Sequence, residues 1–406
     1  MSPLELSYHN QTLENCEKNS RLHHALKTIL GQGTSWAHLS HLTTCIWMVA
    51  AVIQSREVNL TKWLPYLPCR GKYAQSKQRR VRRWLGNNRI NVHRLYKPII
   101  KAALADWQDE MMYLSLDTSL YWDEYCLIRL AVVHRGRALP LSWRVLAHPS
   151  ASVSANACRE LLQDAAKLLP ERVKVVLLAD RGFVHTDTMT LVKTFGWHYR
   201  IRCKSNTWFW RSTRGWSQLN SFAIQPGQAF CWHNVRLHKG QQYGPVHVIF
   251  GRNNVNGQFW AVISDEPTNL QTFAEYGLRF DIEEAFRDDQ SGGWQLQSSK
   301  LRSVCVLSRL FFVLALATLY VTAQGLDVVH SRRRRWVDPH WFRGNSYFRL
   351  GLEWIRSALL QGWPLVRRVA FLTNSDPDPA MASRSQHRRC SDRLEFQVYS
   401  SSYFPD

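Results

Sequence analysis

VKVVLLAD, residues 173–180, is an almost wholly apolar run that ends abruptly in an acid, a pattern typical of a buried strand. A second run, MMYLSLD at residues 111–117, alternates apolar and polar side chains and also ends in an acid. Burying the apolar positions fixes where each acid lies. We therefore expect Asp117 and Asp180 to emerge at the ends of two strands.

Between these two runs the sequence predicts two further strands and a helix. The strands YCLIRLAVVHRG and ALPLSWRVLAH are joined by the turn HRGRA, and a helix is expected from Ala155 to Leu169, before Pro170. Three antiparallel strands, a helix and a fourth strand predict a mixed α/β domain.

Changes of pattern divide the rest of the chain. The part before residue 109 has helical spacing, short alternating runs separated by Gly, Asn and Pro follow Arg200, and helices resume at Leu270. The expected segments are a helical, basic domain at 1–108, an α/β core at 109–199 and 268–330, a β-rich insertion at 200–267, a C-terminal helical segment at 331–376 and a polar tail at 377–406.

The charge of the chain favours a polyanionic partner. It has 52 Lys and Arg against 31 Asp and Glu, a formal net charge of +21. From Val58 to Ala105 there is no acidic residue but twelve Lys or Arg, eight of them between Lys77 and Lys97. A solvated basic helix is the alternative to a DNA-facing surface here. The residues we expect near a DNA backbone or groove are Arg79, Arg80, Arg82 and Arg83.

A third acid, Glu283, lies in the stretch YGLRFDIEEAFRDDQ, which is expected to be helical. Tyr276, Arg279, Glu283 and Arg287 follow three- and four-residue steps and therefore line one stripe. Arg287 is accordingly a candidate DNA contact. The adjacent Glu284 points at least a quarter-turn away and is not expected to share the task of Glu283. Carboxylates from two strands and a helix can together hold divalent metal ions against a phosphodiester.

Each acid, taken alone, also has an ordinary structural explanation. Asp117 is typical of a turn or cap, and Asp180 is suited to cap the following helix or to pair with Arg181. Exposed helices often carry Glu and Arg at the spacing of Glu283 and Arg279.

The cysteines and apolar runs bear on the cellular compartment. Nine cysteines are scattered without a CxxC pair or zinc-finger spacing, which suits thiols in a reducing compartment and disfavours zinc. The first residues, MSPLELSYHNQTLENC, lack the pattern of a signal peptide. The uncharged run from Leu310 to Leu326 is short for a membrane span, and Gln324 and Gly325 weaken its end. We expect a buried core helix there, with an interfacial or membrane role as the alternative.

In their order along the chain, the three acidic stretches resemble the motifs of the insertion-sequence-four family of DDE transposases. YGLRFDIEEAFRDDQ is similar to that family's signature of Tyr, two residues, Arg, three residues, Glu, six residues and Lys, with Tyr276, Arg279 and Glu283 at matching positions. LSLDTS around Asp117 and LLADRGF around Asp180 resemble the first and second acidic motifs.

The resemblance runs from about Met111 to Gly362 and implies a ribonuclease-H-like catalytic domain, with the β-rich insertion between the second Asp and the Glu. It implies that Asp117, Asp180 and Glu283 bind two Mg²⁺ or Mn²⁺ ions per active site, for which oxygen ligands are suited. The implied reaction is two-metal cleavage of DNA, followed by transfer of the 3′ ends to a target.

The same resemblance implies particular DNA contacts. Tyr276 and Arg279 match positions that contact DNA phosphate near the cleavage point. Gln290 stands where the signature has Lys, which keeps a hydrogen-bond donor and removes a charge. Trp260 resembles an insertion-domain Trp that stacks on a flipped base, with Phe280 as a second aromatic beside it. A core position in the insertion is the alternative for Trp260.

The expected partners are double-stranded DNA, as terminal inverted repeats and as target, and a second copy of the chain in a synaptic homodimer. No membrane partner is expected, and the resemblance and the thiol usage indicate a bacterial cytoplasm, at the nucleoid. Two alternatives stay open. One is a DNA-binding transposase relic without cleavage, which Gln290 leaves open; the other is a ribonuclease-H-like nuclease without strand transfer, which the stripe of Tyr276 and Arg279 disfavours.

Overall fold

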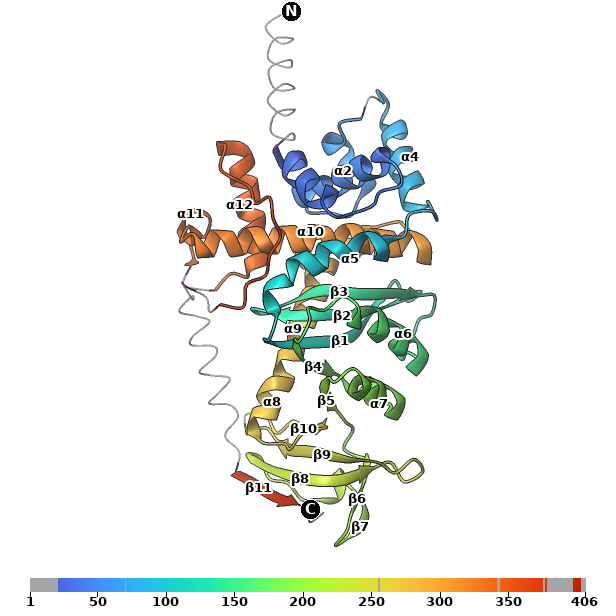
Figure 1. Cartoon of the computed structure of the whole chain (residues 1–406), viewed down its shortest axis with the longest axis vertical. Coiled ribbons are helices and arrows are strands. Elements are labelled where there is room, and N and C mark those ends of the chain that lie inside the picture. Colours follow the sequence, from blue (N-terminus) through green and yellow to red (C-terminus); the bar gives the residue numbers. More distant parts are fainter. Residues whose placement is uncertain are drawn as a thin grey trace, which may run out of the picture.

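The computed structural model describes residues 21–69, 71–254, 256–341, 344–374, 377 and 397–402, the last group by its backbone only (Figure 1). Its strands are β1 Met111–Tyr121, β2 Tyr125–His134, β3 Arg137–Leu146, β4 Lys174–Ala179, β5 His198–Arg202, β6 Trp208–Arg211, β7 Gly215–Gln218, β8 Gln228–Leu237, β9 Tyr243–Arg252, β10 Phe259–Ser264 and β11 Gln397–Ser402. In the described part of the chain these strands form one mixed sheet in the order β3-β2-β1-β4-β5-β10-β9-β8-β6-β7, with β11 beside β8. Of the expected polar tail at 377–406, only residue 377 and β11 lie within the described residues.

The first three strands form two consecutive antiparallel hairpins. β1 pairs with β2 and β2 with β3, and the second hairpin turns at Arg135 and Gly136, whose φ angles are 50° and 77°. Two successive positive φ angles give the tight turn that matches the twist of antiparallel strands. After a helix, β4 lies parallel to β1, and β5 lies parallel to β4. The order of elements predicted for residues 111–180 is confirmed.

β1 continues beyond Asp117, so the prediction that the strand ends at this acid is wrong. Its parallel pairing with β4 stops at Leu116 opposite Ala179, whereas its antiparallel pairing with β2 continues to Tyr121 opposite Tyr125. The hairpin with β2 carries the strand past the acid. Asp117 is the first residue of β1 beyond the edge shared with β4.

The β-rich insertion extends this same sheet beyond β5 (Figure 1). The pairings from β5–β10 through β10–β9, β9–β8 and β8–β6 to β6–β7 are all antiparallel. The expected start of the insertion at residue 200 falls inside β5, and the added strands begin at Trp208. The α/β core and the insertion therefore share one hydrogen-bonded sheet.

Helices gather at the β3 end of the sheet and on its faces (Figure 1). They comprise residues 21–31, α2 Leu39–Ser55, α3 Leu60–Trp63, α4 Ala74–Leu85, α5 Val92–Ala103, α6 Ala155–Ala166, α7 Thr186–Thr194, α8 Leu270–Gly277, α9 Asp281–Arg287, α10 Val304–His330, α11 Arg334–Val337 and α12 Tyr347–Gln361. The basic segment forms α4 and α5 with a turn at residues 86–88 between them, as the sequence predicts.

Arg309 of α10 fixes the basic helix α4 to the rest of the protein. Its buried guanidinium donates to the carbonyl of Leu85 at the end of α4 (3.2 Å) and to Asn88 Oδ1 in the turn (3.2 Å). The C-terminal end of a helix carries partial negative charge, so a cation stabilises it. The helical domain and the sheet are thus joined through α10.

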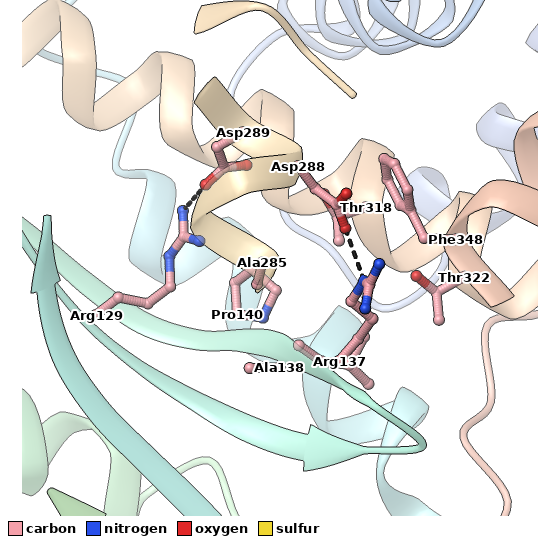
Figure 2. Close-up of a pocket in the computed structure, with 11 residues that line it drawn as sticks. Arg129, Arg137, Ala138, Pro140, Ala285, Asp288, Asp289, Thr318, Thr322 and Phe348 are labelled. Carbon is pink, nitrogen blue, oxygen red and sulfur yellow. Dashed lines mark hydrogen bonds and ion pairs between the residues drawn. The ribbon is translucent and has the colours of Figure 1, made fainter. Parts of the chain in front are cut away.

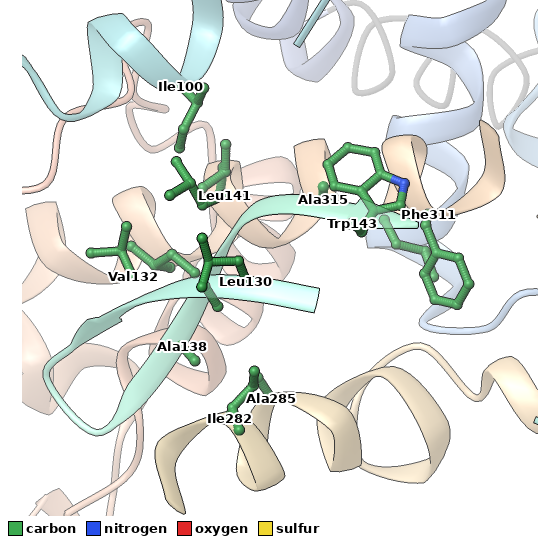
Figure 3. Packing of buried hydrophobic residues seen from close by; sticks show 14 of the residues in the cluster. Ile100, Leu130, Val132, Ala138, Leu141, Trp143, Ile282, Ala285, Phe311 and Ala315 are labelled. Carbon is green, nitrogen blue, oxygen red and sulfur yellow. The ribbon is translucent and has the colours of Figure 1, made fainter. Parts of the chain in front are cut away.

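Apolar side chains from helices on both sides cover β2 and β3 (Figure 3). Ile282 and Ala285 of α9 lie on one side of the two strands, and Ile100 of α5 lies on the other. Phe311 and Ala315 of α10 lie beside β3. This packing sets the distance between α9 and the sheet.

α10 is long and apolar enough to span a membrane by length and composition, and 72% of its most apolar window is buried inside the protein. The prediction of a buried core helix is confirmed. The helix itself continues past Gln324 and Gly325 to His330. Gln324 Oε1 accepts the N–H of Val366 (2.9 Å), and Gly325 lets the backbone of α12 approach.

Candidate active site

The edge shared by β1 and β4 brings the first two acids together. Leu116 and Ala179 form the last parallel pair, so Asp117 and Asp180 are the next residues on neighbouring strands. Both strands run in the same direction, and their carboxyl-terminal sides therefore meet at one edge of the sheet. Both acids are half-buried.

Glu283 reaches the same place from the helical run formed by α8, the 3₁₀ turn η5 (Leu278–Phe280) and α9. Arg279 in η5 donates from Nη1 to Asp117 Oδ2 (2.7 Å) and from Nη2 to Glu283 Oε1 (2.6 Å). The side chain of Arg279 is 4% exposed, whereas that of Glu283 is 47% exposed. A buried guanidinium therefore links the strand acid to the helix acid.

Tyr276 at the end of α8 joins Asp180 to this cluster. Its hydroxyl donates to Asp180 Oδ1 (3.4 Å) and accepts from Arg279 Nε (3.1 Å). The three predicted acids, Tyr276 and Arg279 consequently form one connected polar group at the end of the β1–β4 edge, which we call the acidic cluster.

The electrostatics of the cluster favour a cation. Burial raises the pKa of Asp117 to about 6. The guanidinium of Arg279 and the N–H of Thr118 lower this pKa, while repulsion from Asp180 and Glu283 raises it. Carboxylates that repel one another are stabilised by positive charge placed among them. Arg279 supplies that charge.

The ordinary structural roles do not account for the two strand acids. Asp180 makes no side-chain capping hydrogen bond to the 3₁₀ turn at Arg181–Phe183. Asp117 Oδ1 accepts the N–H of Thr118 (2.8 Å), but its other carboxylate oxygen faces Arg279. Both acids thus direct an oxygen into the cluster.

Glu284 and Arg287 stand apart from the acidic cluster. Arg287 Nη1 lies 2.6 Å from Glu284 Oε1, and the Arg287 side chain is 70% exposed. The prediction that Glu283 and Glu284 differ in role agrees with their different partners. Arg287 does not join Tyr276 and Arg279, because it turns toward Glu284 at the helix surface.

The donor set of the cluster fits a hard divalent cation. Three carboxylates supply the oxygen ligands that Mg²⁺ and Mn²⁺ prefer. The oxygens of Asp117, Asp180 and Glu283 do not all lie within 4.8 Å of one another. Arg279 lies between two of them, so the carboxylates can close around an ion once the guanidinium moves aside.

A second group of possible metal ligands, His198, Asp265 and Glu266, does lie within that distance. Its carboxylates already have a cation, since Arg200 Nη2 lies 2.7 Å from Glu266 and Arg200 Nη1 lies 3.9 Å from Asp265. His198 Nδ1 is 2.9 Å from Asp265 and Nε2 is 3.6 Å from Glu266, so the two ring nitrogens address different carboxylates. One ion cannot use both nitrogens, and we assign this group to ion pairing at the ends of β5 and β10.

Trp260 of β10 and Phe280 of η5 lie beside the acidic cluster. Their ring centroids are 6.0 Å apart, and they lie 5.8 Å and 6.3 Å from the ring of Tyr276. Both rings are half-buried. Trp260 also packs 6.0 Å from Phe273, a core contact of the kind that the alternative predicts. The structure therefore brings the two predicted aromatics together, next to the hydroxyl that contacts Asp180.

Gln290 lies in a π-helical turn, η6 Asp288–Gly292, directly after α9. Its Nε2 donates to Ser119 Oγ (2.9 Å) on β1, two residues beyond Asp117. The amide that stands in the position of the signature lysine thus has a partner within the protein. A π turn of this kind is frequent near functional sites.

Two arginine–carboxylate pairs that the sequence analysis missed hold the helix of Glu283 against the sheet, beside a small cavity (Figure 2). Arg129 of β2 lies 2.5 Å from Asp289, with side chains only 3% and 5% exposed, and Arg137 of β3 lies 2.9 Å from Asp288. The signal for the first pair is present in the sequence, because Arg129 interrupts the apolar run YCLIRLAVV. A buried charge needs a partner, and the paired acids of RDDQ supply it.

The four arginines predicted to face DNA do not share one environment. Arg79, Arg82 and Arg83 are exposed on α4. Arg80 instead donates from Nε to Thr44 Oγ1 (3.1 Å) and lies 4.6 Å from the centre of the Trp47 ring. Arg80 is therefore packed against α2, and three of the four side chains project freely from the helix surface.

Comparison with known proteins agrees with this geometry. Residues 124–320 match the family model described as the transposase DDE domain. The matched region contains Asp180 and Glu283 and begins seven residues after Asp117. This match supports a DDE transposase; it concerns the domain as a class and not the insertion-sequence-four signature.

Among solved structures, the chain is similar to the piggyBac transposase synaptic complex with hairpin DNA, determined by cryo-EM. The identity is 8% and the TM-score 0.44, and the similarity covers 92% of this chain and 87% of the other. The comparison with curated proteins gives no match.

Proposed function

We propose that the chain is a DNA transposase that binds the terminal repeats of its element, cleaves the DNA and transfers the 3′ ends to target DNA. The observation that supports this most directly is the convergence of Asp117, Asp180 and Glu283 on Arg279 and Tyr276. The transposase domain match over residues 124–320 gives the same class of protein from independent information.

The fold that we propose for the catalytic region is ribonuclease-H-like. The strand order β3-β2-β1-β4-β5, with β4 and β5 parallel to β1 and the first three strands antiparallel, supports it. The two strand acids lie directly beyond the last parallel pair of β1 and β4, and the third comes from a helix packed on the same sheet.

Within this proposal, Asp117, Asp180 and Glu283 hold two Mg²⁺ or Mn²⁺ ions. When bound, such ions activate the attacking oxygen and stabilise charge on the leaving oxygen of the phosphodiester. Arg279 and Tyr276 lie against the three acids and carry hydrogen-bond donors. Once the guanidinium is released from Asp117, it can donate a charge-assisted hydrogen bond to a phosphate oxygen beside the scissile bond.

The remaining contacts follow from what surrounds the acidic cluster. Trp260 and Phe280 are close enough together to stack on one extruded base, and unstacking a base favours aromatic contact. The exposed arginines of α4 hold the duplex by its phosphates. A cut-and-paste reaction requires the two ends of the element to be brought together, so we further propose a DNA-bound homodimer. We propose that it acts at the nucleoid of a bacterial cytoplasm.

Two other functions are separated from this one by experiment. A ribonuclease-H-like nuclease would cleave without joining ends, and a transposase relic would bind without cleaving. Gln290 is the observation that favours the relic, since it replaces a lysine of the signature and is engaged with Ser119.

The experiment is cleavage and joining of a labelled duplex that carries the terminal repeat of the flanking element, with Mg²⁺, resolved on denaturing gels. Glu283→Gln should abolish both products while leaving duplex binding within about twofold of wild type, because it removes a metal ligand and not the basic surface. Glu284→Gln is the matched control and should retain activity, since Glu284 pairs with Arg287 away from the cluster.

Cleaved and joined products that disappear only in Glu283→Gln would establish the transposase. Cleaved products without joined ones would support the nuclease, and binding without cleavage in wild type would support the relic.

A further inference from the structure

A long run without acidic residues extends from α7 through most of the insertion. From Thr188 to Ser264 the chain has nine Lys or Arg and no Asp or Glu. This run is longer than the acid-free segment around α4, and it lies in a different part of the molecule. Positive charge without interleaved acids favours a polyanionic partner.

Strand register gathers aromatic residues on one face of the insertion. Trp210 of β6 pairs with Trp216 of β7 on one side and with Arg236 of β8 on the other. Residues directly opposite one another in antiparallel strands project from the same face. Trp216, Trp210 and Arg236 therefore form one row across three strands, and Trp208 lies two residues from Trp210 on the same face.

The two faces of β6 differ sharply. Phe209 and Arg211 alternate with the tryptophans and are 0% and 3% exposed, and Arg211 lies 4.0 Å from the centre of the Trp232 ring. This inner face is packed and closed. The indoles of Trp208 and Trp210 are instead half-buried, so the outer face of the strand stays accessible to solvent.

A cation lies near each of these half-buried indoles. Lys239 Nζ is 3.5 Å from the centre of the Trp208 ring, and Arg236 Cζ is 5.9 Å from that of Trp210. Both cations are exposed; Arg236 Nη1 donates to Gln242 Oε1 (3.5 Å), and within the described residues neither cation forms an ion pair with a carboxylate. A cation–π interaction is enough to explain each of these two contacts. It does not explain why the whole face lacks acids.

Aromatic rings on a sheet with cations beside them are the elements that bind unpaired nucleotides, because each base stacks on a ring while its phosphate meets a cation. Double-stranded DNA keeps its bases stacked and offers this face only phosphates. We propose that the outer face of β6, β7 and β8, formed by Trp208, Trp210, Trp216, Arg236 and Lys239, binds single-stranded DNA without sequence preference.

The position of this face in the molecule gives the interaction a use. β6 and β7 lie at the end of the long axis opposite α4, and β1 and β4, which carry the strand acids, lie between them (Figure 1). If a duplex bound on α4 were opened near the acidic cluster, one of its separated strands would lie in the part of the protein that ends in this face. The binding itself needs none of the three acids, so it stands or falls independently of the proposed cleavage.

The test is fluorescence anisotropy of a labelled oligothymidylate with the full-length protein. The starting protein carries Arg79→Gln, Arg82→Gln and Arg83→Gln, so that α4 does not mask the result. Adding Arg236→Gln and Lys239→Gln should weaken binding about tenfold and lower the salt slope by about 1.4, two phosphate contacts at about 0.7 each on single strands. The matched control adds Lys174→Gln and Lys193→Gln, which remove two exposed charges outside the face, and should change binding by less than about threefold.

Stacking is tested separately with Trp216→Ala and a strand of abasic sites of the same length. The protein with wild-type side chains at this face should bind the oligothymidylate about tenfold more tightly than the abasic strand. Trp216→Ala should remove most of that difference in affinity. Circular dichroism of each variant verifies the fold.

Equal losses in the Arg236/Lys239 variant and its control would mean that net charge alone binds the strand, and would overturn the proposal. So would a preference for the base-bearing strand that Trp216→Ala leaves intact in a folded protein. Asp180→Asn should bind the oligothymidylate like its parent, whatever its effect on cleavage.

Discussion

Arg279 is the residue on which the candidate active site depends at the scale of single side chains. It is buried, it contacts Asp117 and Glu283 directly, and it touches the hydroxyl that contacts Asp180. Removing one partner from a buried ion pair is far more costly than the net worth of the pair, since it leaves uncompensated charge. Arg279 therefore supplies the positive charge that links the carboxylates, in the place that another cation would take.

This role predicts the behaviour of Arg279→Met, which keeps a chain of similar length and loses the charge. Without divalent ions, the variant should be less stable than wild type by about 3 kcal/mol, because Asp117 loses its counter-charge. Added Mn²⁺ should raise its unfolding temperature more than that of wild type, since no guanidinium competes for the carboxylates. Thermal unfolding by circular dichroism with and without Mn²⁺ measures both effects.

The control for this prediction is Arg287→Met, which removes the same kind of side chain from an exposed pair with Glu284. It should respond to Mn²⁺ as wild type does. An equal Mn²⁺ effect in all three proteins would show that Arg279 does not stand in a cation's place.

Asp288 predicts a dependence of stability on pH. Burial raises its pKa to about 6, more than the ion pair with Arg137 lowers it. In the unfolded chain a carboxyl of this type has a pKa of about 3.9, so the folded protein binds the proton more tightly. The contribution of Asp288 to stability is therefore least favourable above pH 6, and it improves as the pH falls from about 6 to about 4.

Asp288→Asn cannot titrate and isolates this effect. The free energy of unfolding of wild type minus that of Asp288→Asn should increase by up to about 3 kcal/mol between pH 7 and pH 4. This follows because the pKa of Asp288 is about two higher in the folded protein than in the unfolded chain. Urea unfolding of both proteins at the two pH values gives the difference. Asp187→Asn, an exposed aspartate of α7, serves as the comparison. A difference that stays constant with pH would contradict the assignment.

At the scale of elements, α10 and α12 cross at backbone contact. Gly325 of α10 faces the carbonyl of Tyr347, and Gly351 of α12 faces the carbonyl of Val321. A Cβ at either glycine would overlap the opposite backbone. Small residues at a crossing let two helices approach to backbone contact, which increases the dispersion energy between them.

Gly325→Ala should accordingly destabilise the protein by about 1–3 kcal/mol, the usual range for overpacking a core. Gly277→Ala in α8 is the matched control, because a Cβ there meets no atom within 4 Å. Alanine has a higher helix propensity than glycine, so the control should be neutral or stabilising by up to about 1 kcal/mol. Chemical denaturation of both variants measures the difference in their free energies of unfolding. A Gly325→Ala protein as stable as its control would show that α12 can shift without loss of stability.

The elements themselves follow from sequence periodicity, whereas their partners do not. The strand of Asp180, the core helix around Leu310 and the α4–turn–α5 segment are all predictable from local pattern. The continuation of β1 past Asp117 depends on β2 as its partner, and the burial of Arg80 depends on Trp47 in another helix. Pairing between distant segments has no local signature, which is why the sequence analysis missed both.

The candidate site shows the same division. The three acids are visible in the sequence because each interrupts a pattern or occupies a motif. The way they are held together, through Arg279 and through the buried pair of Arg129 and Asp289, depends on the depth of α9 on the sheet. That depth is set by tertiary packing.

At the scale of the whole molecule, α4 lies at one end of the long axis and the insertion at the other, with the sheet between them (Figure 1). Arg309 ties α4 to α10, which packs on β3. If the duplex binds α4 as proposed, it is held by a helix that hydrogen bonds to α10, the helix that packs on β3. Binding there would then also position the duplex relative to the strands of the acidic cluster.

This arrangement predicts different consequences for arginines that are neighbours on one helix. Changing Arg79, Arg82 and Arg83 together to Gln should weaken binding to a random duplex and lower the salt slope by up to about 2.7, at about 0.9 per phosphate contact. Arg80→Gln should leave the slope nearly unchanged and should lower the stability instead, since Arg80 packs on Trp47.

Anisotropy titrations at several salt concentrations, with thermal unfolding of the same proteins, separate the two effects. The control removes three exposed lysines, one just after α6, one on β4 and one on α7, by changing Lys167, Lys174 and Lys193 to Gln, which alters the net charge equally. A salt slope that falls as much in this control as in the α4 variant would mean that DNA binding depends only on the total charge of the protein. A fall confined to the α4 variant would mean that the duplex lies along this helix, because only phosphates within contact distance release their counterions to a particular side chain.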